Sequence, residues 1–377
     1  MAQFLVIGDP NDLHTRLRID YLRQLGHSLE LLCEKTEMQR MLQREGQCPW
    51  VHPVDLPYFS WKKTKQRRTG ASLIEERIGQ TGAQLLLILY GEPHVGWAFY
   101  QRRWNIPIAL HTYGTDALVT LPRITQMGWL APLRRMLFRR AFQGVHLFLA
   151  CSRKQFETLA HITPPHVQKE LVRIGLKTAE LERFKQQQWA SPLPGPYIIF
   201  PRIMHPIYNH EACIEAIALL PDDIRRSHAF VFVDANSRYT TYTEQLRRKM
   251  EKLSDVQWEW LPRLDAIQLW NWIHHAALCV QIPNTDAMAV TALETLYLDT
   301  PLLLGPATYD DDLYAGVPRT RVVAKEIAEC ITRLIASPLP PRTDPSTLRQ
   351  LTDVELQCAA MEKHLLALIE RQDRTYK

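Results

Sequence analysis

Short apolar runs alternate with longer amphipathic stretches along this chain, and the whole alternation occurs twice. This pattern is typical of parallel β-sheets covered by helices. A Pro- and Gly-rich segment that begins at Ser191, SPLPGP, separates the two series and is typical of a linker. The length of 377 residues also fits two domains. The sequence therefore predicts an α/β protein with two doubly wound, Rossmann-like domains that face each other across a cleft.

We place the domains at residues 1–188 and 196–340, with a last helix over residues 349–377 that is expected to pack back toward the N-terminal domain. The expected strands are residues 4–7, 29–33, 85–89, 108–111 and 147–150 in the first series, and 197–200, 230–233, 256–260, 278–282 and 301–304 in the second.

Several protein classes are disfavoured by what the sequence lacks. No apolar run approaches the roughly 18–20 residues needed to cross a bilayer. The first ten residues, MAQFLVIGDP, contain neither a basic segment nor a cleavage site of a secretory signal. The seven cysteines form no C-x-x-C pair, and no His, Asp or Glu cluster has metal-ligand spacing. We therefore expect a cytoplasmic protein without disulfides, bound metal or cofactor.

Positive charge is concentrated in the first half of the chain. Residues 1–180 carry 24 Lys and Arg against 15 Asp and Glu, and no acidic residue occurs between Asp116 and Glu157. This imbalance indicates an anionic partner, either a membrane surface or nucleic acid. The segment from Trp129 to Phe142 predicts an amphipathic basic helix, and the segment from Trp61 to Arg68 is a second candidate contact. The acidic second half and the absence of a known recognition motif argue against nucleic acid.

Within the basic helix, a helical projection groups four apolar residues on one face, with Arg135 and Arg139 opposite. The four residues are Leu130, Leu133, Leu137 and Ala141. Two interpretations remain: the helix lies on an anionic leaflet, or it packs on the core with a solvated basic face.

The strongest functional pattern is PNTDAMAVTALETLYLDTPLLLG at residues 283–305. Asp286 follows an expected strand, residues 287–289 are expected to begin a helix, and Glu294 lies one to two turns into it. A helix N-terminus after a strand offers free backbone amides to a diphosphate. The alternative is an ordinary turn with Asp286 near the N-cap.

This segment resembles the donor-binding segment of the retaining GT-B glycosyltransferases of the large family four, in which two acidic residues are separated by seven others. Other segments resemble that family in the same order along the chain. They are Val6-Ile7-Gly8, HTYGTD at residues 111–116, Ala150-Cys151-Ser152, the stretch from Arg173 to Phe184, and Ile199-Phe200-Pro201-Arg202. The chain departs from the family in having Asp286 in place of a glutamate and Ala287 in place of a glycine. It also lacks the lysine expected five or six residues after the arginine, where Ile207 and Tyr208 stand.

The resemblance implies roles for individual residues. Arg202 and the amides near Met288, Ala289 and Val290 would bind the donor diphosphate, with Asp286 on the sugar hydroxyls and Glu294 on the ribose. Arg263 would lie near the nucleobase, Gly8 would let the backbone approach the cleft, and His111, Tyr113 and Asp116 would lie on the acceptor side. Arg263 and His111 also fit ordinary structural positions, as a solvated loop arginine and a buried histidine at a strand end.

The resemblance further implies a hexosyltransferase that moves a sugar from a nucleotide sugar to a glycan or lipid-linked acceptor with retention of configuration. Retention in that family is usually explained by attack on the front face, with the departing diphosphate helping to take the acceptor proton. A role in bacterial surface polysaccharide or glycan biosynthesis is expected by analogy, as is peripheral association with the inner face of the cytoplasmic membrane. Two alternatives are a degenerate, non-catalytic nucleotide- or sugar-binding protein of the same fold and a GT-B sugar-nucleotide epimerase.

Overall fold

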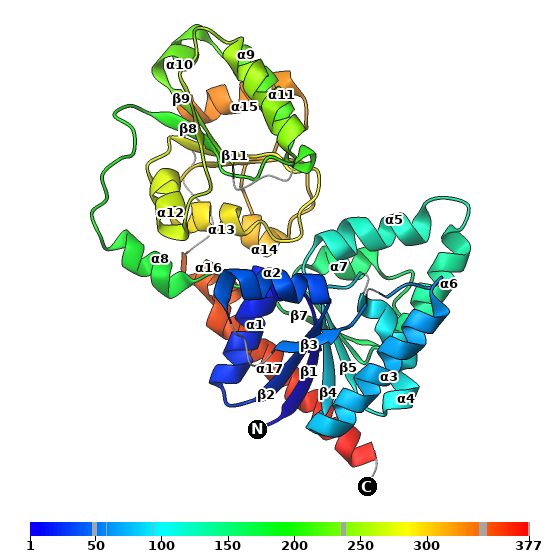
Figure 1. Cartoon of the computed structure of the whole chain (residues 1–377). Helices are drawn as coiled ribbons and strands as arrows, with labels where there is room; N and C mark the ends of the chain where they lie inside the picture. Colours follow the sequence, from blue (N-terminus) through cyan, green and yellow to red (C-terminus); the bar gives the residue numbers. More distant parts are fainter. Residues whose placement is uncertain (47–50, 58, 93, 235–238, 339–344, 376–377) are drawn as a thin grey trace. The chain divides into compact units, whose positions relative to one another are not determined.

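The structure is a computed structural model that describes residues 1–377 except 47–50, 58, 93, 235–238, 339–344 and 376–377 (Figure 1). The chain divides into two compact units. Unit 1 consists of Met1–Gly175 together with Val354–Lys377, and unit 2 consists of Leu176–Asp353. The division after Gly175 leaves residues 176–188, which the sequence had suggested for the first domain, in unit 2.

Unit 1 is built on a parallel sheet of seven strands in the order β3-β2-β1-β4-β5-β6-β7. The strands are β1 (Gln3–Ile7), β2 (Ser28–Cys33), β3 (Val51–Asp55), β4 (Leu85–Leu89), β5 (Ile108–Thr112), β6 (Leu147–Ala150) and β7 (Gln168–Leu171). The central strands are buried on both faces, which explains why β4 is a continuous apolar run, LLLIL.

Helices cover the two faces of this sheet. They are α1 (Leu13–Gln24), α2 (Lys35–Glu45), α3 (Thr64–Thr81), η1 (His94–Tyr100), α4 (Gln101–Trp104), η2 (Asp116–Thr120), α5 (Leu121–Gln126), α6 (Ala131–Phe142), α7 (Arg153–Thr158) and α17 (Val354–Thr375). Leu5 and Ile7 of β1 pack in one core cluster with Ile74 of α3 and Phe138 of α6. Because side chains alternate along a strand, the intervening residues face α1 and α17 on the other side.

The first helix, α1, has clear end signals in the sequence. The side chain of Asp12 accepts a hydrogen bond from the Thr15 amide at 2.7 Å and caps its N-terminus. At the other end, Gly26 has a φ of 82°, a conformation that glycine adopts without strain.

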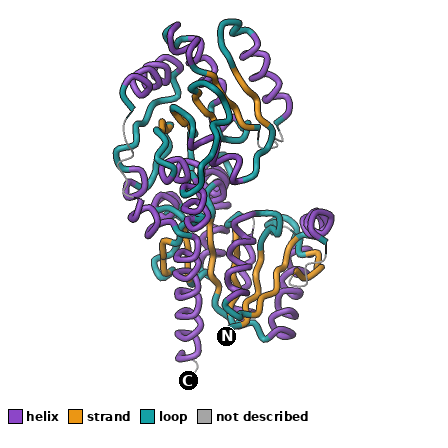
Figure 2. The backbone as a smooth tube through the Cα atoms, turned by 90° about the vertical axis from the view of Figure 1, so that its left-hand side faces the viewer, coloured by secondary structure: helices purple, strands orange, loops and turns teal. Residues whose placement is uncertain are grey.

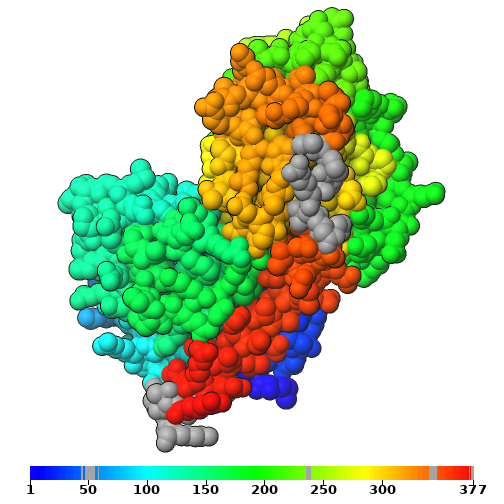
Figure 3. Space-filling view, turned by 180° about the vertical axis from the view of Figure 1, so that it is seen from behind, coloured from blue at the N-terminus to red at the C-terminus, as the bar shows by residue number. Residues whose placement is uncertain are grey.

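The last helix, α17, is part of unit 1 although it follows unit 2 in sequence. Figure 2 shows it as one unbroken helix, and in Figure 3 it lies (red) beside the earliest residues of the chain (dark blue). Arg18 of α1 donates a hydrogen bond to the Cys358 sulfur at 2.8 Å. His27 accepts one from the Ala2 amide at Nδ1 and donates another from Nε2 to Glu362 at 2.7 Å.

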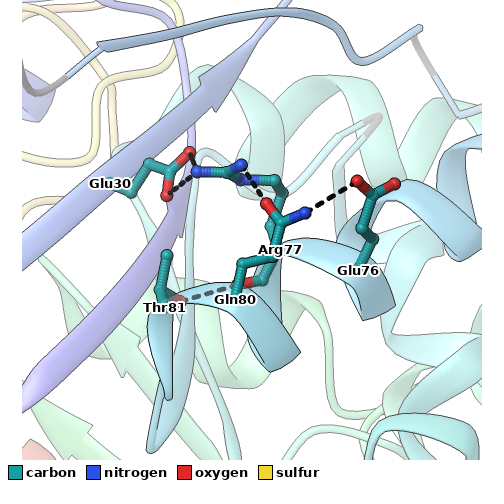
Figure 4. Close-up of polar contacts among 5 residues, drawn as sticks. All are labelled: Glu30, Glu76, Arg77, Gln80 and Thr81. Atoms are coloured by element: carbon teal, nitrogen blue, oxygen red, sulfur yellow. Dashed lines mark hydrogen bonds and ion pairs between the residues drawn. The ribbon is translucent and has the colours of Figure 1, made fainter.

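Polar contacts attach α3 to the sheet (Figure 4). Arg77 near the end of α3 pairs with Glu30 on β2 at 2.7 Å and also binds Gln80 on its own helix. Thr81 donates back to the Arg77 carbonyl at 2.7 Å. These contacts connect the last turn of α3 to β2.

Unit 2 contains a second parallel sheet, of five strands in the order β10-β9-β8-β11-β12. The strands are β8 (Tyr197–Phe200), β9 (Ala229–Val233), β10 (Trp258–Leu261), β11 (Leu278–Gln281) and β12 (Leu302–Leu304). The helices are α8 (Thr178–Lys185), η3 (Pro206–Tyr208), α9 (His210–Ala218), α10 (Asp222–Ser227), α11 (Thr240–Glu251), α12 (Ala266–His274), α13 (Val290–Tyr297), α14 (Asp311–Tyr314), α15 (Ala324–Ala336) and α16 (Pro345–Thr352). The core between the sheet and α9, α11 and α15 includes Phe200, Phe230 and Ile331.

Both sheets are parallel and doubly wound, which confirms the predicted α/β class with two Rossmann-like domains. β8 lies at the centre of the second sheet: the chain adds β9 and β10 on one side of it, then crosses back to place β11 and β12 on the other side, so the strand order reverses beside β8. In such sheets ligands bind outside the carboxyl ends of the strands at this reversal point.

Candidate functional site

Arg202 and Asp286 meet at the carboxyl end of the central strand of unit 2. Arg202 lies two residues after β8 ends, and Asp286 lies in the loop between β11 and α13. Nη2 of Arg202 donates to Oδ2 of Asp286 at 3.0 Å. Both side chains are largely buried, with 16% and 12% of their surface exposed. The structure thus brings together two residues that are 84 positions apart and that the family resemblance had singled out in separate segments.

Tyr208 is the third member of this group. Its hydroxyl accepts a hydrogen bond from the same Nη2 of Arg202 at 2.6 Å, and its ring lies under the guanidinium at 4.3 Å. Burial lowers the pKa of Arg202, but Asp286 and Tyr208 more than offset this and raise it, so the side chain remains charged. A tyrosine thus contacts the arginine at one of the two positions where family four would carry its lysine.

Two further tyrosines border the group from the segment after β12. Tyr309 and Tyr314 are buried, with ring centroids 4.9 Å apart, and the Tyr314 hydroxyl donates to the Ala289 carbonyl at 3.2 Å. Burial, and next to it the negative charge of Asp286, raise the pKa of both phenols, which therefore stay protonated. Sequence reasoning missed both residues. The sequence signal that could have indicated them is their position after β12, because β12 pairs with β11 and the carboxyl ends of the two strands lie side by side.

Glu294 lies in the second turn of α13 and is half-buried. Its Oε1 accepts a hydrogen bond from the indole N–H of Trp270 on α12 at 3.0 Å. Burial raises the pKa of Glu294 to about 7, and the Trp270 bond and the charge of Arg202 offset only part of this rise. Near neutral pH the side chain therefore exists in both protonation states. Trp270 was also missed by sequence reasoning.

The loop before α13 differs from the predicted helix start. Helical structure begins at Val290 rather than at residue 287, and the side chains of Met288 and Ala289 are buried. The first-turn amides of α13 therefore come from Val290 onward. Arg263 is exposed in the loop between β10 and α12, and among the residues that the structure describes it forms no hydrogen bond or ion pair with Arg202 or Asp286.

In unit 1, His111 lies near the carboxyl end of β5 and is fully buried. Its Nε2 is 3.2 Å from the Val172 carbonyl, which makes this nitrogen the donor. Burial, with a smaller contribution from Arg18, lowers its pKa well below the usual value and keeps the ring neutral. The ring also packs edge-on against Tyr113, with centroids 4.9 Å apart.

Asp116 is fully buried and holds backbone groups together. Its Oδ2 accepts from the Gly91 amide at 2.6 Å, and its Oδ1 accepts from Gly114 at 2.8 Å and Tyr113 at 3.2 Å. Burial raises the pKa of this carboxyl, although the backbone N–H groups counter the rise. The carboxylate fixes the turns that follow β4 and β5, because both of its oxygens are engaged.

Gly8, at the end of β1, is closely packed within unit 1. A Cβ atom there would lie 3.2 Å from Leu89 Cβ and 3.3 Å from a methyl group of Thr15. Close packing between β1, β4 and α1 therefore accounts for a small residue at this position.

The two basic segments of unit 1 lie next to each other, and we call the surface to which both contribute the basic apolar face. Trp61 packs edge-on against Phe138 of α6, with ring centroids 6.1 Å apart, and against Phe99, with ring centroids 5.6 Å apart. Beside them lies a cavity of about 600 Å³ whose lining includes Arg102 and Arg140. The segment 61–68, which leads into α3, therefore lies beside α6, and the basic apolar face consists of residues 61–68 and 129–142.

The inward side of α6 is not the one that the helical projection indicated. Ala131, Phe138, Ala141 and Phe142 are the buried residues of this helix. Leu133, which the projection had grouped with Ala141, is 49% exposed, and Met136 is 47% exposed. Trp129, just before the helix, is 89% exposed. Large apolar side chains on the basic apolar face thus point to solvent among the arginines.

Among the residues that the structure describes, no group of His, Cys, Asp and Glu is arranged to hold a metal ion. No helix in the described ranges is both long and apolar enough to cross a bilayer.

Neither a family model nor a curated protein matches the sequence. Solved structures do match it over nearly its whole length. Sucrose-phosphate synthase from Thermosynechococcus elongatus is 15% identical, with coverage of 97% of this chain and 100% of that one and a TM-score of 0.70. A glycosyltransferase from Rickettsia africae is 13% identical, with 98% coverage of both chains and a TM-score of 0.73. An α,α-trehalose-phosphate synthase (UDP-forming) from Burkholderia vietnamiensis is 12% identical, with coverage of 97% and 100% and a TM-score of 0.72.

The protein thus has the GT-B fold, with two Rossmann-like domains like those of these solved structures. At these identities the similarity establishes the fold, and the chemistry of the site depends on its own residues.

Proposed function

We propose that the protein is a retaining hexosyltransferase that moves a sugar from a nucleotide-sugar donor to a glycan or lipid-linked acceptor. The main observation behind this proposal is the contact between Arg202 and Asp286 at the reversal point of the unit 2 sheet. The helix that contains Glu294 begins directly after this loop. A cation at that edge suits a diphosphate, and carboxylates suit hydroxyl groups. The charged arginine would stabilise the negative charge that develops on the departing diphosphate.

The mechanism that we propose needs no metal or cofactor. Attack comes from the face that the leaving group departs from, and the diphosphate helps to take the acceptor proton. The protein then contributes positioning and charge stabilisation. Arg202 would hold the diphosphate together with first-turn amides of α13, Asp286 would bind the sugar hydroxyls, and Glu294 would bind the ribose. In unit 1, His111 and Tyr113 would lie on the acceptor side, with Asp116 shaping the turns beside them.

The test is a thermal-shift panel of nucleoside diphosphates and their sugars in the uridine, guanosine, cytidine, adenosine and thymidine series. The UDP-forming neighbour makes the uridine series the first to try. A ligand at about 100 times its Kd adds roughly 2.7 kcal/mol of stability, enough to move the melting temperature by several degrees. We expect a base-specific shift that Glu294→Ala abolishes. The matched control is Glu329→Ala, which removes an exposed carboxylate from α15 of the same unit.

A second candidate is a non-catalytic nucleotide-binding protein of the same fold, and the specific observation in its favour is Tyr208 beside Arg202 where family four would supply a lysine. Donor hydrolysis separates the candidates. A shift without hydrolysis or transfer supports the binder, whereas release of the sugar with its anomeric configuration retained supports the transferase. Interconversion of donor epimers would instead indicate an epimerase.

We further propose that the basic apolar face binds anionic membrane surfaces. It combines cationic residues with exposed Trp129, Leu133 and Met136. Exposed aromatic and aliphatic side chains among arginines suit insertion into the headgroup region of an anionic leaflet. Peripheral location on the inner face of the cytoplasmic membrane, close to lipid-linked acceptors of surface polysaccharide synthesis, would follow.

A further inference from the structure

The diphosphate-binding arginine of the proposed donor site is already occupied by the protein's own side chains. We propose that Asp286 is an intramolecular competitor of the donor diphosphate, so that the Arg202–Asp286 ion pair has to open before a phosphate group can bind two nitrogens of the guanidinium at once. This inference rests on the proposed function, and it adds a closed state of the site that the donor has to open.

The geometry at one nitrogen carries the argument. Nη2 of Arg202 donates to the Asp286 carboxylate at 3.0 Å and to the Tyr208 hydroxyl at 2.6 Å. This nitrogen has only two protons, so both are engaged.

Nη2 also belongs to both bidentate edges of a guanidinium, the edge it shares with Nε and the edge it shares with Nη1. Two-pronged binding of a phosphate through either edge requires one Nη2 proton. While both protons are taken, neither edge is fully available. A phosphate must therefore displace Asp286 or Tyr208.

The charge of Asp286 and the stacking of Tyr208 indicate that Asp286 is the main competitor. The ring of Tyr208 lies against the guanidinium at 4.3 Å, and this stacking can persist when a phosphate binds at the edge. Asp286 lies in the loop before α13 and carries the negative charge that a diphosphate would oppose. Its carboxylate is only 12% exposed, so solvent screens this repulsion weakly.

The test measures the affinity of phosphate-bearing probes for the full-length protein by titration calorimetry at one pH and ionic strength. The variant is Asp286→Asn, which keeps the size of the side chain and removes its charge. The probes are the five nucleoside diphosphates, inorganic pyrophosphate, and uridine as a probe without phosphate. None of these probes carries a donor sugar, so a role of Asp286 in sugar binding does not affect the result.

We expect Asp286→Asn to tighten pyrophosphate and nucleoside diphosphate binding by about tenfold and to leave uridine binding unchanged. The matched control is Asp299→Asn, which makes the same change at an exposed position of unit 2, where Asp299 pairs with Lys185 at 2.6 Å. It should leave every dissociation constant unchanged. Tyr208→Phe frees the other Nη2 proton and should tighten binding less.

Equal or weaker binding of the phosphate probes by folded Asp286→Asn, relative to the parent, would overturn the proposal. So would the absence of binding of any probe to either protein. Tighter pyrophosphate binding by the variant, with no nucleoside diphosphate bound by either protein, would support the competition and reject the nucleotide-sugar function. If Asp286→Asn does not fold, Tyr208→Phe decides, because unchanged binding in that variant contradicts the occupied-nitrogen argument.

Discussion

In unit 2, burial and neighbouring groups together determine which side chains of the candidate site are charged. Arg202 keeps its charge because Asp286 and Tyr208 lie against it, and Tyr309 stays protonated because it is buried beside Asp286. Glu294 differs because its pKa of about 7 falls within the working range of most proteins. The charge of the site therefore changes with pH mainly through this residue.

We predict that Glu294 costs stability as the pH rises. The pKa of Glu294 is about 7 in the folded protein, whereas the ordinary value of a glutamate is 4.5. Between pH 4.5 and about pH 7 the folded protein therefore holds a proton that the unfolded chain releases. The free energy of unfolding therefore falls as pH rises from 4.5 to about 7, and it changes no further through this group above that. Replacing Glu294 by Gln removes the titration.

The measurement compares melting temperatures at pH 5 and pH 8. The melting temperature of Glu294→Gln minus that of the parent protein should be larger at pH 8 than at pH 5. Glu329→Gln, at an exposed helix position, should follow the parent at both values. A constant difference between parent and Glu294→Gln across this range would show that the residue does not titrate there.

At the scale of elements, prediction succeeded for buried strands and failed for polar ones. The bounds of β4, β6 and β8 were predicted as the structure has them, because strands buried on both faces are continuous apolar runs. β3 and β7, at the two edges of the sheet, were missed. β7 reads QKEL and β3 contains Pro53, compositions that an edge strand tolerates and a hydrophobic pattern does not reveal.

We predict that a methyl group at Gly175 disrupts the packing of the start of α17 against this residue. A Cβ there would lie 2.2 Å from the Val354 Cα, the first residue of that helix. Backbone atoms cannot yield as a flexible side chain can, so Gly175→Ala should cost about 1–3 kcal/mol of unfolding free energy. Urea denaturation measures this loss.

The control for that experiment is Gly79→Ala in α3. A Cβ at residue 79 would meet nothing within 4 Å, and the residue lies inside a helix. Alanine there should raise stability by about 0.5–1 kcal/mol. Equal changes in the free energy of unfolding for the two substitutions would mean that the close contact between Gly175 and Val354 does not affect stability.

For the whole molecule, the fold was predictable and the detail of the candidate site was not. Asp286, Glu294 and Arg202 were singled out from the sequence because they lie in segments that resemble family motifs with fixed spacing. Tyr309, Tyr314 and Trp270 lie outside those motifs, and they reach Asp286 or Glu294 only through the order of strands in the sheet. Sequence spacing cannot show a contact that depends on which strands become neighbours.

The membrane binding that we propose involves a broad surface of unit 1, the basic apolar face, and is predicted to need both charge and apolar insertion. The parent protein should float with vesicles that contain anionic lipid and should be released by high salt. Trp129→Ala together with Met136→Ala should weaken this binding several-fold, because both side chains are exposed on the basic apolar face.

Leu219→Ala is the control for those substitutions, since it removes an exposed leucine from unit 2. Flotation that is independent of anionic lipid, or that is unchanged by the double substitution, would contradict the proposed membrane contact.

The return of α17 to unit 1 has a consequence for synthesis on the ribosome. Unit 1 combines residues 1–175 with residues 354–377, and Arg18 and His27 contact Cys358 and Glu362. All of unit 2 is therefore translated before the helix that completes unit 1 exists. During that interval the surface of α1 that α17 later covers is open, which makes the nascent first unit the stage at which chaperones would be needed.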